Sequence, residues 1–216
     1  MWSRGHIYLS KKYSNVDFTG ITIAPNQVEL AKKFAEKREV NNTSFMLGTY
    51  LDTKFPNNYF DGVFALESSS YAQNHNEFVD EMFSILKPGG RLVVVDSFLI
   101  KDPLNPIMQK IYNEFCLGFG YANLPVLDSY TTYLKEKGFS KINVEDISKN
   151  VGKSVFVYSV AVFPFFLSNI SKRVLKFGKY RLADDLVGFS RGSTILAGLL
   201  GLSGAIGYFG TSTVKR

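Results

Sequence analysis

One stretch near the middle of the chain, residues 57–96, limits the fold more than any other part of the sequence. It opens with a short apolar run, 61–66, that ends on Glu67, as a buried parallel strand does at its functional end. Residues 75–86 carry apolar side chains at helical spacing, and a second apolar run then ends on Asp96. Strand, helix and strand in this order predict a βαβ unit in a parallel sheet, whose ligands lie at the carboxyl ends of the strands.

The residues between this helix and the second strand predict a turn. Lys87 lies in the last helical turn, Pro88 cannot continue the helix, and Gly89 and Gly90 follow. Further elements are expected before and after the unit: strands at 17–23, 44–47 and 208–214, a helix after Pro25, and a helix and a strand on either side of Gly138. This alternation predicts a Rossmann-like α/β fold, with a mainly parallel sheet and helices on both faces.

Two segments also resemble a known family. The sequence FPNNYFDGVFALESSSYA at 55–72, followed by LKPGGRLVVVDSF at 86–98, resembles the fourth and fifth strands of class I S-adenosylmethionine (SAM) methyltransferases. The likeness is greatest to the small-molecule (type 11) group with the sterol, tocopherol and cyclopropane-forming enzymes. It covers roughly residues 5–150 and implies a SAM cofactor and the Rossmann-like fold.

The resemblance also implies residues that bind the cofactor. Thr22 stands where most of the family has an acid that binds the ribose hydroxyls. Thr22 and Gln27 would therefore contact the nucleoside by neutral hydrogen bonds. The alternative is that Thr22 is an ordinary strand threonine and Gln27 a solvent-facing helix glutamine. Thr49 replaces the usual acid that binds the adenine amino group, which leaves adenine recognition at that atom open. Tyr50 matches an aromatic that packs on adenine, although a tyrosine after a strand is as often part of the core.

The expected catalytic residues follow the fourth family strand. Glu67 would face the methionine end of the cofactor or the acceptor, where it orients or polarises. Tyr71 and His75 come next in the loop, and either is a candidate to remove a proton. The alternative for His75 is an ordinary surface histidine. Cys116 is the only cysteine, which excludes a disulfide within the chain and a cysteine-rich zinc site, and we assign no metal ligands.

One family feature is missing from the sequence. A class I methyltransferase has a first strand followed by a glycine-rich turn that lets the backbone approach the cofactor, and nothing before Asp17 supplies it. Gly5 is the candidate for the last glycine of that turn. We therefore expect an N-terminal truncation that removes a central strand. We also expect the 216-residue chain on its own to aggregate and to transfer no methyl group.

The charge is distributed unevenly along the chain. Residues 1–146 carry 15 basic and 17 acidic side chains, whereas 147–216 carry 10 basic and 2 acidic ones. The basic C-terminal segment suggests peripheral membrane contact, and an ordinary solvated basic face is the alternative. The uncharged stretch 192–214 is a weak membrane-span candidate, but its recurring glycines favour a buried helix that leads into a last strand. Since no signal peptide is visible, a cytoplasmic location is expected, with or without membrane contact.

These observations lead to one main interpretation. Residues 1–150 are expected to form a partial SAM-methyltransferase core with an acceptor lid at 101–127, and 151–216 a basic and apolar extension. The predicted reaction is methyl transfer to carbon or oxygen of a hydrophobic small molecule of lipid, sterol, prenyl-quinol or polyketide type, without nucleic acid as a partner. The alternatives are a noncatalytic fragment or lipid-surface protein and, more weakly, a nicotinamide-binding Rossmann enzyme. Neither the acceptor nor the oligomeric state follows from the sequence.

Overall fold

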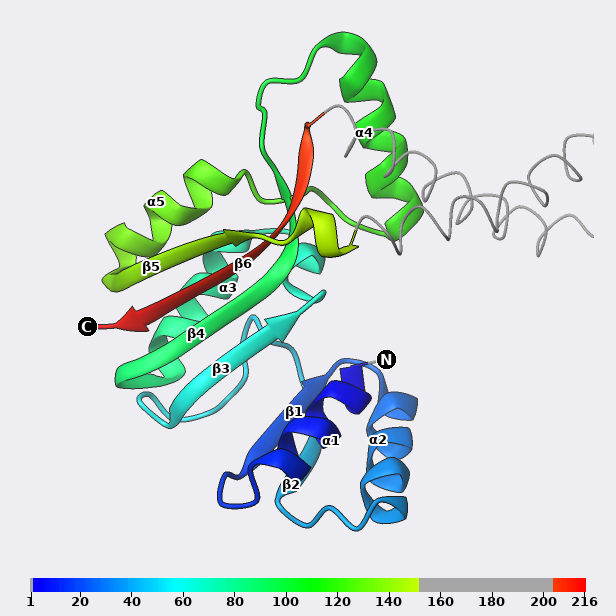
Figure 1. Ribbon diagram of the computed structural model, residues 1–216, viewed down its shortest axis with the longest axis vertical. Coiled ribbons are helices and arrows are strands. Elements are labelled where there is room, and N and C mark those ends of the chain that lie inside the picture. Colours follow the sequence, from blue (N-terminus) through cyan, green and yellow to red (C-terminus); the bar gives the residue numbers. More distant parts are fainter. Residues whose placement is uncertain (1, 152–203) are drawn as a thin grey trace, which may run out of the picture.

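The computed structural model describes residues 2–151 and 204–216, and Figure 1 shows how its elements are arranged. Helices and strands alternate for most of the chain, as the sequence predicts. In chain order the elements are α1 (Trp2–Lys12), β1 (Phe18–Thr22), α2 (Pro25–Lys37), β2 (Thr43–Leu47), β3 (Phe60–Leu66), a 3-10 turn (Ser69–Tyr71), α3 (His75–Ile85), β4 (Leu86–Leu99), α4 (Pro106–Phe119), α5 (Leu127–Lys137), β5 (Phe139–Asp146) and β6 (Ile206–Lys215).

The strands form two sheets. β1 and β2 pair in parallel, and the larger sheet has the order β3-β4-β6-β5. In the larger sheet β3 and β4 are parallel, while β6 runs antiparallel to both of its neighbours. The Rossmann-like α/β class is confirmed. β1 and β3 do not pair with each other, and a gap separates them in Figure 1.

A histidine of α1 spans the space between the two sheets. His6 is buried, and its ring lies 5.6 Å from that of Phe18, 5.0 Å from that of Phe45 and 6.2 Å from that of Phe64. Phe18 belongs to β1, Phe45 to β2 and Phe64 to β3. Aromatic contacts through one side chain therefore connect the two sheets where no strand pairing does.

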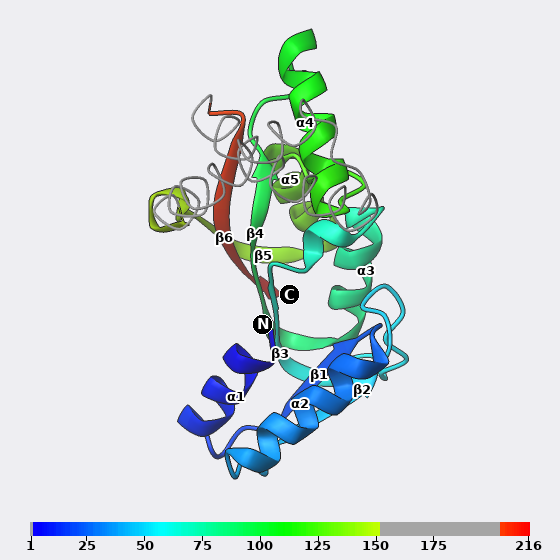
Figure 2. The same cartoon turned by 90° about the vertical axis from the view of Figure 1, so that its right-hand side faces the viewer.

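The main core lies between the larger sheet and the helices α3 and α5, which sit on the same side of β4 (Figure 2). Alternate residues of β4 and β6 point into it, as the period of a strand requires. The buried members of this core are Ala65, Ala72, Phe78, Val79, Met82, Ile85, Leu86, Leu92, Val94, Phe98, Tyr130, Leu134, Phe139 and Phe209. On β3, Phe64 and Leu66 remain 43% and 48% exposed.

The Lys-Pro-Gly-Gly sequence lies inside the first part of β4, because α3 ends at Ile85 and β4 begins at Leu86. The prediction that Lys87 lies in the last helical turn is wrong, since Pro88 keeps the residue before it out of the helical region. Gly89 has a φ of 80°, in the left-handed region that glycine tolerates best. A Cβ on Gly90 would lie 2.7 Å from the Lys87 carbonyl oxygen, so a side chain does not fit there. The two glycines lie where the pairing of β4 with β3 is irregular, since the register shifts between Phe60 and Gly62.

The segment proposed as a lid contains the long helix α4, which ends at Gly120 with a φ of 74°. Its inner face packs against the end of β4 and the start of β6, through buried residues that include Leu99, Cys116 and Ala205. The predicted last strand is present as β6. The basic run at 172–181 and most of the uncharged stretch that begins at Gly192 lie outside the described residues. Among the helices that the structure describes, none is both long and apolar enough to span a bilayer.

Candidate active site

The carboxyl end of β3 presents the carboxylate that the sequence analysis puts at the centre of the site. Glu67 follows Leu66 directly, and its N–H donates to the Val95 carbonyl of β4 at 2.9 Å. Its backbone is left-handed, with a φ of 49°, which few residues other than glycine adopt. The Glu67 side chain is exposed and able to meet a ligand. Backbone strain of this kind is concentrated at functional sites.

A tyrosine from the last strand holds the Glu67 carboxylate. Tyr208 Oη donates to Glu67 Oε1 at 2.6 Å. The antiparallel pairing of β6 with β4 places Tyr208 opposite Ser97, close to the end of β3. Burial and the neighbouring Glu67 raise the pKa of Tyr208, so its hydroxyl keeps its proton at neutral pH. The sequence analysis missed Tyr208, because 141 positions separate it from Glu67 and only the sheet order brings them together.

A buried carboxylate fastens the turn after Glu67 to β4. Asp96 is 1% exposed, and it costs free energy to bury such a group unless hydrogen-bond donors surround it. Its two oxygens accept from the Ser69 hydroxyl at 2.7 Å, the Ser70 N–H at 3.0 Å, the Ser70 hydroxyl at 2.5 Å and the Ser97 N–H at 2.9 Å. The network fixes the turn that links Glu67 to Tyr71. The sequence analysis noted Asp96 only as the end of a strand.

Aromatic rings from the turn and from the loop after α4 meet beside this network. The Tyr71 ring lies 4.8 Å from that of Tyr121, edge to face, and Tyr121 stacks on Phe119 at 5.5 Å. Burial raises the pKa of Tyr121, so its hydroxyl also stays protonated. Tyr71 is half exposed. The structure thus brings the predicted Tyr71 together with Tyr121, which lies in the segment 101–127 expected to act as a lid.

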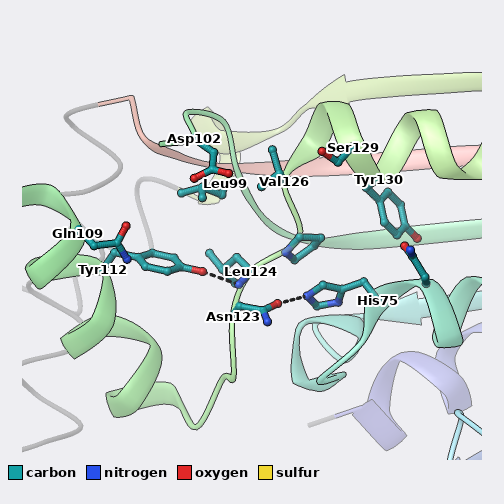
Figure 3. Close-up of a pocket in the computed structure, with 12 residues that line it drawn as sticks. His75, Leu99, Asp102, Gln109, Tyr112, Asn123, Leu124, Val126, Ser129 and Tyr130 are labelled. Carbon is teal, nitrogen blue, oxygen red and sulfur yellow. Dashed lines mark hydrogen bonds between the residues drawn. The ribbon is translucent and has the colours of Figure 1, made fainter. Parts of the chain in front are cut away.

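His75 begins α3 and faces the loop between α4 and α5. Its Nε2 lies 2.7 Å from Asn123 Oδ1 (Figure 3). Burial lowers the pKa of His75, and hydrogen bonds to Asn123 and to the Ser69 backbone counteract this only in part. The imidazole is therefore neutral at neutral pH. His75 is half-buried and bonded to the lid segment, which differs from the ordinary surface histidine that was the alternative.

The two residues expected at the nucleoside lie together at the junction of β1 and α2. Thr22 Oγ1 donates to Gln27 Oε1 at 2.8 Å and accepts from the Ala24 N–H at 3.3 Å. Ile23, which follows β1, is 76% exposed, and Leu47 at the end of β2 is 56% exposed. Neutral polar groups beside exposed apolar side chains suit the ribose hydroxyls and the flat base of a nucleoside. The residues at these two strand ends therefore fit SAM.

The other predicted cofactor residues have mixed surroundings. Thr49 Oγ1 accepts from the Leu51 N–H at 3.2 Å, so the side chain stabilises the local turn. Tyr50 is half-buried and packs edge to face on Phe78 at 5.5 Å, and burial raises its pKa. Gly5 lies inside α1 rather than in a turn, and a Cβ there would meet no atom within 4 Å. Tyr50 thus contributes to the core, as one alternative held, and Gly5 shows no close approach that requires glycine.

A cavity of about 360 Å³ lies between α4, α5 and the end of β4 (Figure 3). His75 and Asn123 border it on one side and Tyr130 on another. Its full lining is His75, Asn76, Leu99, Asp102, Gln109, Tyr112, Asn123, Leu124, Pro125, Val126, Ser129 and Tyr130. The segment expected to act as a lid, 101–127, provides more than half of this lining.

Comparisons with known proteins bear on this arrangement. Residues 3–94 match the family described as a methyltransferase domain. Sterol 24-C-methyltransferase erg6 of Aspergillus fumigatus is 29% identical over 153 residues, which cover 69% of this chain and 41% of that protein. The chloroplastic tocopherol O-methyltransferase of Arabidopsis thaliana is 28% identical over 150 residues, which cover 67% of this chain and 43% of that protein. The chain thus spans about two fifths of the length of these relatives.

Solved structures share the fold at lower sequence identity. A candidate sarcosine dimethylglycine methyltransferase from Galdieria sulphuraria superposes with a TM-score of 0.75 at 18% identity, over 97% of this chain and 73% of that one. Phosphoethanolamine N-methyltransferase 2 of Haemonchus contortus, solved with SAM, gives a TM-score of 0.66 at 17% identity, over 92% of this chain and 43% of that one. Residues 3–94 thus match the methyltransferase-domain family, and the chain shares the Rossmann-like fold of these solved methyltransferases.

Proposed function

We propose that the chain is a SAM-dependent methyltransferase that acts on carbon or oxygen of a hydrophobic small molecule. The observation that carries the proposal is the Glu67 carboxylate at the end of β3, held by Tyr208 and flanked by the aromatic pair Tyr71 and Tyr121. Relatives of the chain are named for sterol and tocopherol methylation, which agrees with an acceptor that is largely apolar.

Thr22 and Gln27 are the proposed contacts to the nucleoside, and Glu67 the proposed contact near the reacting end. When bound, SAM supplies a methyl group on a positively charged sulfur. The protein mainly positions the acceptor atom in line with that methyl group. Glu67 favours positive charge at this point, and the hydrogen bond from Tyr208 fixes the direction of its carboxylate.

The proton of an acceptor hydroxyl needs a place to go. We propose His75 or Tyr71 as the group that receives it, directly or through water. The lowered pKa of His75 leaves its imidazole uncharged at neutral pH, which is the form that accepts a proton. Because the Asn123 amide oxygen only accepts, Nε2 carries the ring hydrogen in this contact. The contact has to break and the ring hydrogen has to move to Nδ1 before Nε2 accepts a proton, so a movement of the lid segment is part of the proposal.

The location in the cell is a separate proposal. A cytoplasmic protein with peripheral membrane contact agrees with the charge of the C-terminal segment, in which 147–216 carry 10 basic and 2 acidic side chains. The basic run at 172–181 lies outside the described residues, so this proposal rests on the sequence alone.

Transfer of labelled methyl groups from SAM to a panel of neutral lipophilic acceptors tests the function. The panel contains a sterol, a prenyl-quinol and a phenolic polyketide. From a version of the protein in which a further strand pairs with the open edge of β3, we expect labelled product with at least one of them. In that version Tyr208→Phe should lower turnover about tenfold, the factor of one lost hydrogen bond in the transition state. Asp61→Asn is the control, because Asp61 is an exposed carboxylate of the same strand that pairs with Lys87 away from the site. Equal losses in the two variants, or no transfer to any acceptor, would contradict the proposal.

A further inference from the structure

The loop between β2 and β3, residues 48–59, leads the chain from the smaller sheet to the larger one. It begins directly after Leu47, at one of the two strand ends that fit the nucleoside. The Leu51 N–H donates to Thr49 Oγ1 at 3.2 Å, and Thr49 forms an isolated bridge with Asp52. These contacts lie within the loop, so they give it a shape but do not attach it to another element.

A carboxylate of α3 attaches the loop to the larger sheet's layer of helices. Glu81 Oε1 accepts from the Thr53 N–H at 2.8 Å and from the Thr53 hydroxyl at 2.5 Å. The Thr53 hydroxyl oxygen in turn accepts from the Phe55 N–H at 3.4 Å. Thr53 is buried, with 6% of its surface exposed, so its two donors need an acceptor inside the protein. One oxygen of Glu81 provides it for both.

A second contact joins the same part of the loop to the same helix. The Tyr50 ring packs edge to face on Phe78 at 5.5 Å. Phe78 and Glu81 are three positions apart, which places them on one side of α3. The ion pair of Lys54 with Asp52 joins two residues of the loop to each other, and its side chains are 80% and 59% exposed, so it contributes little to the position of the loop. The first half of the loop is thus attached to one face of α3 at two points.

We propose that Glu81 is a positioning residue for the cofactor, which holds residues 49–53 against α3 so that the loop meets the base of the nucleoside already ordered. A loop that is ordered in advance loses little further conformational entropy when a ligand binds to it. Glu81 acts only through the loop. That the ligand is SAM rests on the proposed function; that Glu81 holds the loop does not.

Amide hydrogen exchange of the 216-residue chain tests the hold on the loop. Glu81→Met removes the acceptor and keeps a good helix former, so we expect the Thr53 amide to exchange nearly as fast as an unprotected amide. Glu81→Gln keeps a side-chain oxygen that is able to accept both bonds, so most of the protection should remain. Val93 of β4, which lies between β3 and β6, should change far less than Thr53. Unchanged protection of Thr53 in Glu81→Met, or equal acceleration at Val93, would overturn the inference.

Glu77→Met is the matched control. Glu77 is an exposed acid one turn earlier on α3, and its carboxylate accepts from Asn74 at the start of the same helix rather than from the loop. We expect the Thr53 amide to exchange in this variant as it does in the unaltered protein. A Thr53 amide that is as fast in Glu77→Met as in Glu81→Met would show that the loop responds to the loss of any acid from α3, and would overturn the role given to Glu81.

Titration calorimetry with S-adenosylhomocysteine measures the consequence for the cofactor, in a version of the protein in which a further strand pairs with the open edge of β3. We expect Glu81→Met to weaken binding about fivefold to tenfold, because only the fraction of molecules with an ordered loop binds. Glu81→Gln and Glu77→Met should bind nearly as the unaltered protein does. Equal affinities of Glu81→Met and the unaltered protein would overturn the inference and leave the proposed function standing. No binding to the unaltered protein would contradict the proposed function, and the exchange of Thr53 would still decide whether Glu81 holds the loop.

Discussion

The backbone of Glu67, at the end of β3, has a left-handed conformation that the surrounding residues hold in place. Glu67 has a φ of 49°, and a left-handed backbone costs a residue other than glycine on the order of 1 kcal/mol. Asp96 holds the turn that follows it, and Tyr208 holds its carboxylate. The turn after Glu67 and its carboxylate are therefore both fixed by hydrogen bonds.

At the same scale, His6 makes stability depend on pH. Burial lowers its pKa from 6.5 to about 4, although a hydrogen bond to the Phe18 backbone opposes the shift. The unfolded chain therefore binds a proton at a higher pH than the folded one. Stability is complete above about pH 6.5 and falls as the pH drops from 6.5 towards 4, by on the order of 2 kcal/mol.

Urea unfolding between pH 4 and 7 measures this dependence. We expect His6→Leu to flatten the curve between pH 4 and 6.5, even if the loss of the Phe18 hydrogen bond lowers stability at every pH. The carboxylates titrate equally in both proteins, so the difference between the curves isolates His6. Parallel curves would show that His6 is not buried as described.

Among the elements, β6 is joined to α3 by Lys215, the last residue of the strand. Lys215 Nζ donates to Asn58 Oδ1 at 2.9 Å, the Phe83 carbonyl at 2.7 Å and the Leu86 carbonyl at 2.8 Å. It also lies 4.4 Å from the centre of the Phe83 ring. The positive charge at the C-terminal end of α3 joins the last strand to the helix that covers the sheet.

Replacement of this side chain tests the connection. Lys215→Met leaves buried carbonyl oxygens without their donor, and we expect it to lower the free energy of unfolding by about 2–3 kcal/mol. Arg216→Met is the matched control, because Arg216 is exposed and should change stability by less than about 0.5 kcal/mol. Chemical denaturation of both variants measures the two changes in the free energy of unfolding. Equal decreases would mean that Lys215 does not join β6 to α3.

The sequence predicted elements well where their signals are local. Apolar periodicity located β3, α3 and β4, and Gly138 marked the end of α5 because it takes a left-handed φ of 111°. Residues that owe their role to sheet order were not predictable in this way. Tyr208 becomes part of the site only because β6 inserts antiparallel between β4 and β5, and His75 meets Asn123 across 48 positions. Local sequence patterns carry no information on the contact of Tyr208 with Glu67 or on that of His75 with Asn123.

For the whole molecule, the division into two sheets leaves an edge of β3 open. The Glu67 N–H points to β4, and backbone N–H groups alternate in direction along a strand. The N–H groups of Val63 and Ala65 therefore also point to β4, while those of Phe64 and Leu66 point to the other edge of β3. Of the strands that the structure describes, none pairs with that edge. Open edges are templates for pairing between chains, which is the basis of the expected aggregation.

Amide hydrogen exchange measures how open the edge is. We expect the amides of Phe64 and Leu66 to exchange at least about tenfold faster than those of Val63 and Ala65, because only the second pair bonds to a neighbouring strand. The same peptide segment thus contains its own control. Equal protection of all four amides would mean that another backbone occupies the edge of β3.

Titration calorimetry with SAM tests the central claim most directly. We expect a version of the protein in which a further strand pairs with the open edge of β3 to bind SAM saturably at one site per chain. In that version Gln27→Ala should weaken binding by about 1 kcal/mol, the scale of one neutral hydrogen bond. Glu29→Ala, an exposed position on the same helix, should bind SAM as the unaltered protein does. Absence of saturable SAM binding, or equal affinities of the Gln27 and Glu29 variants, would contradict the claim that the ends of these strands form a SAM site.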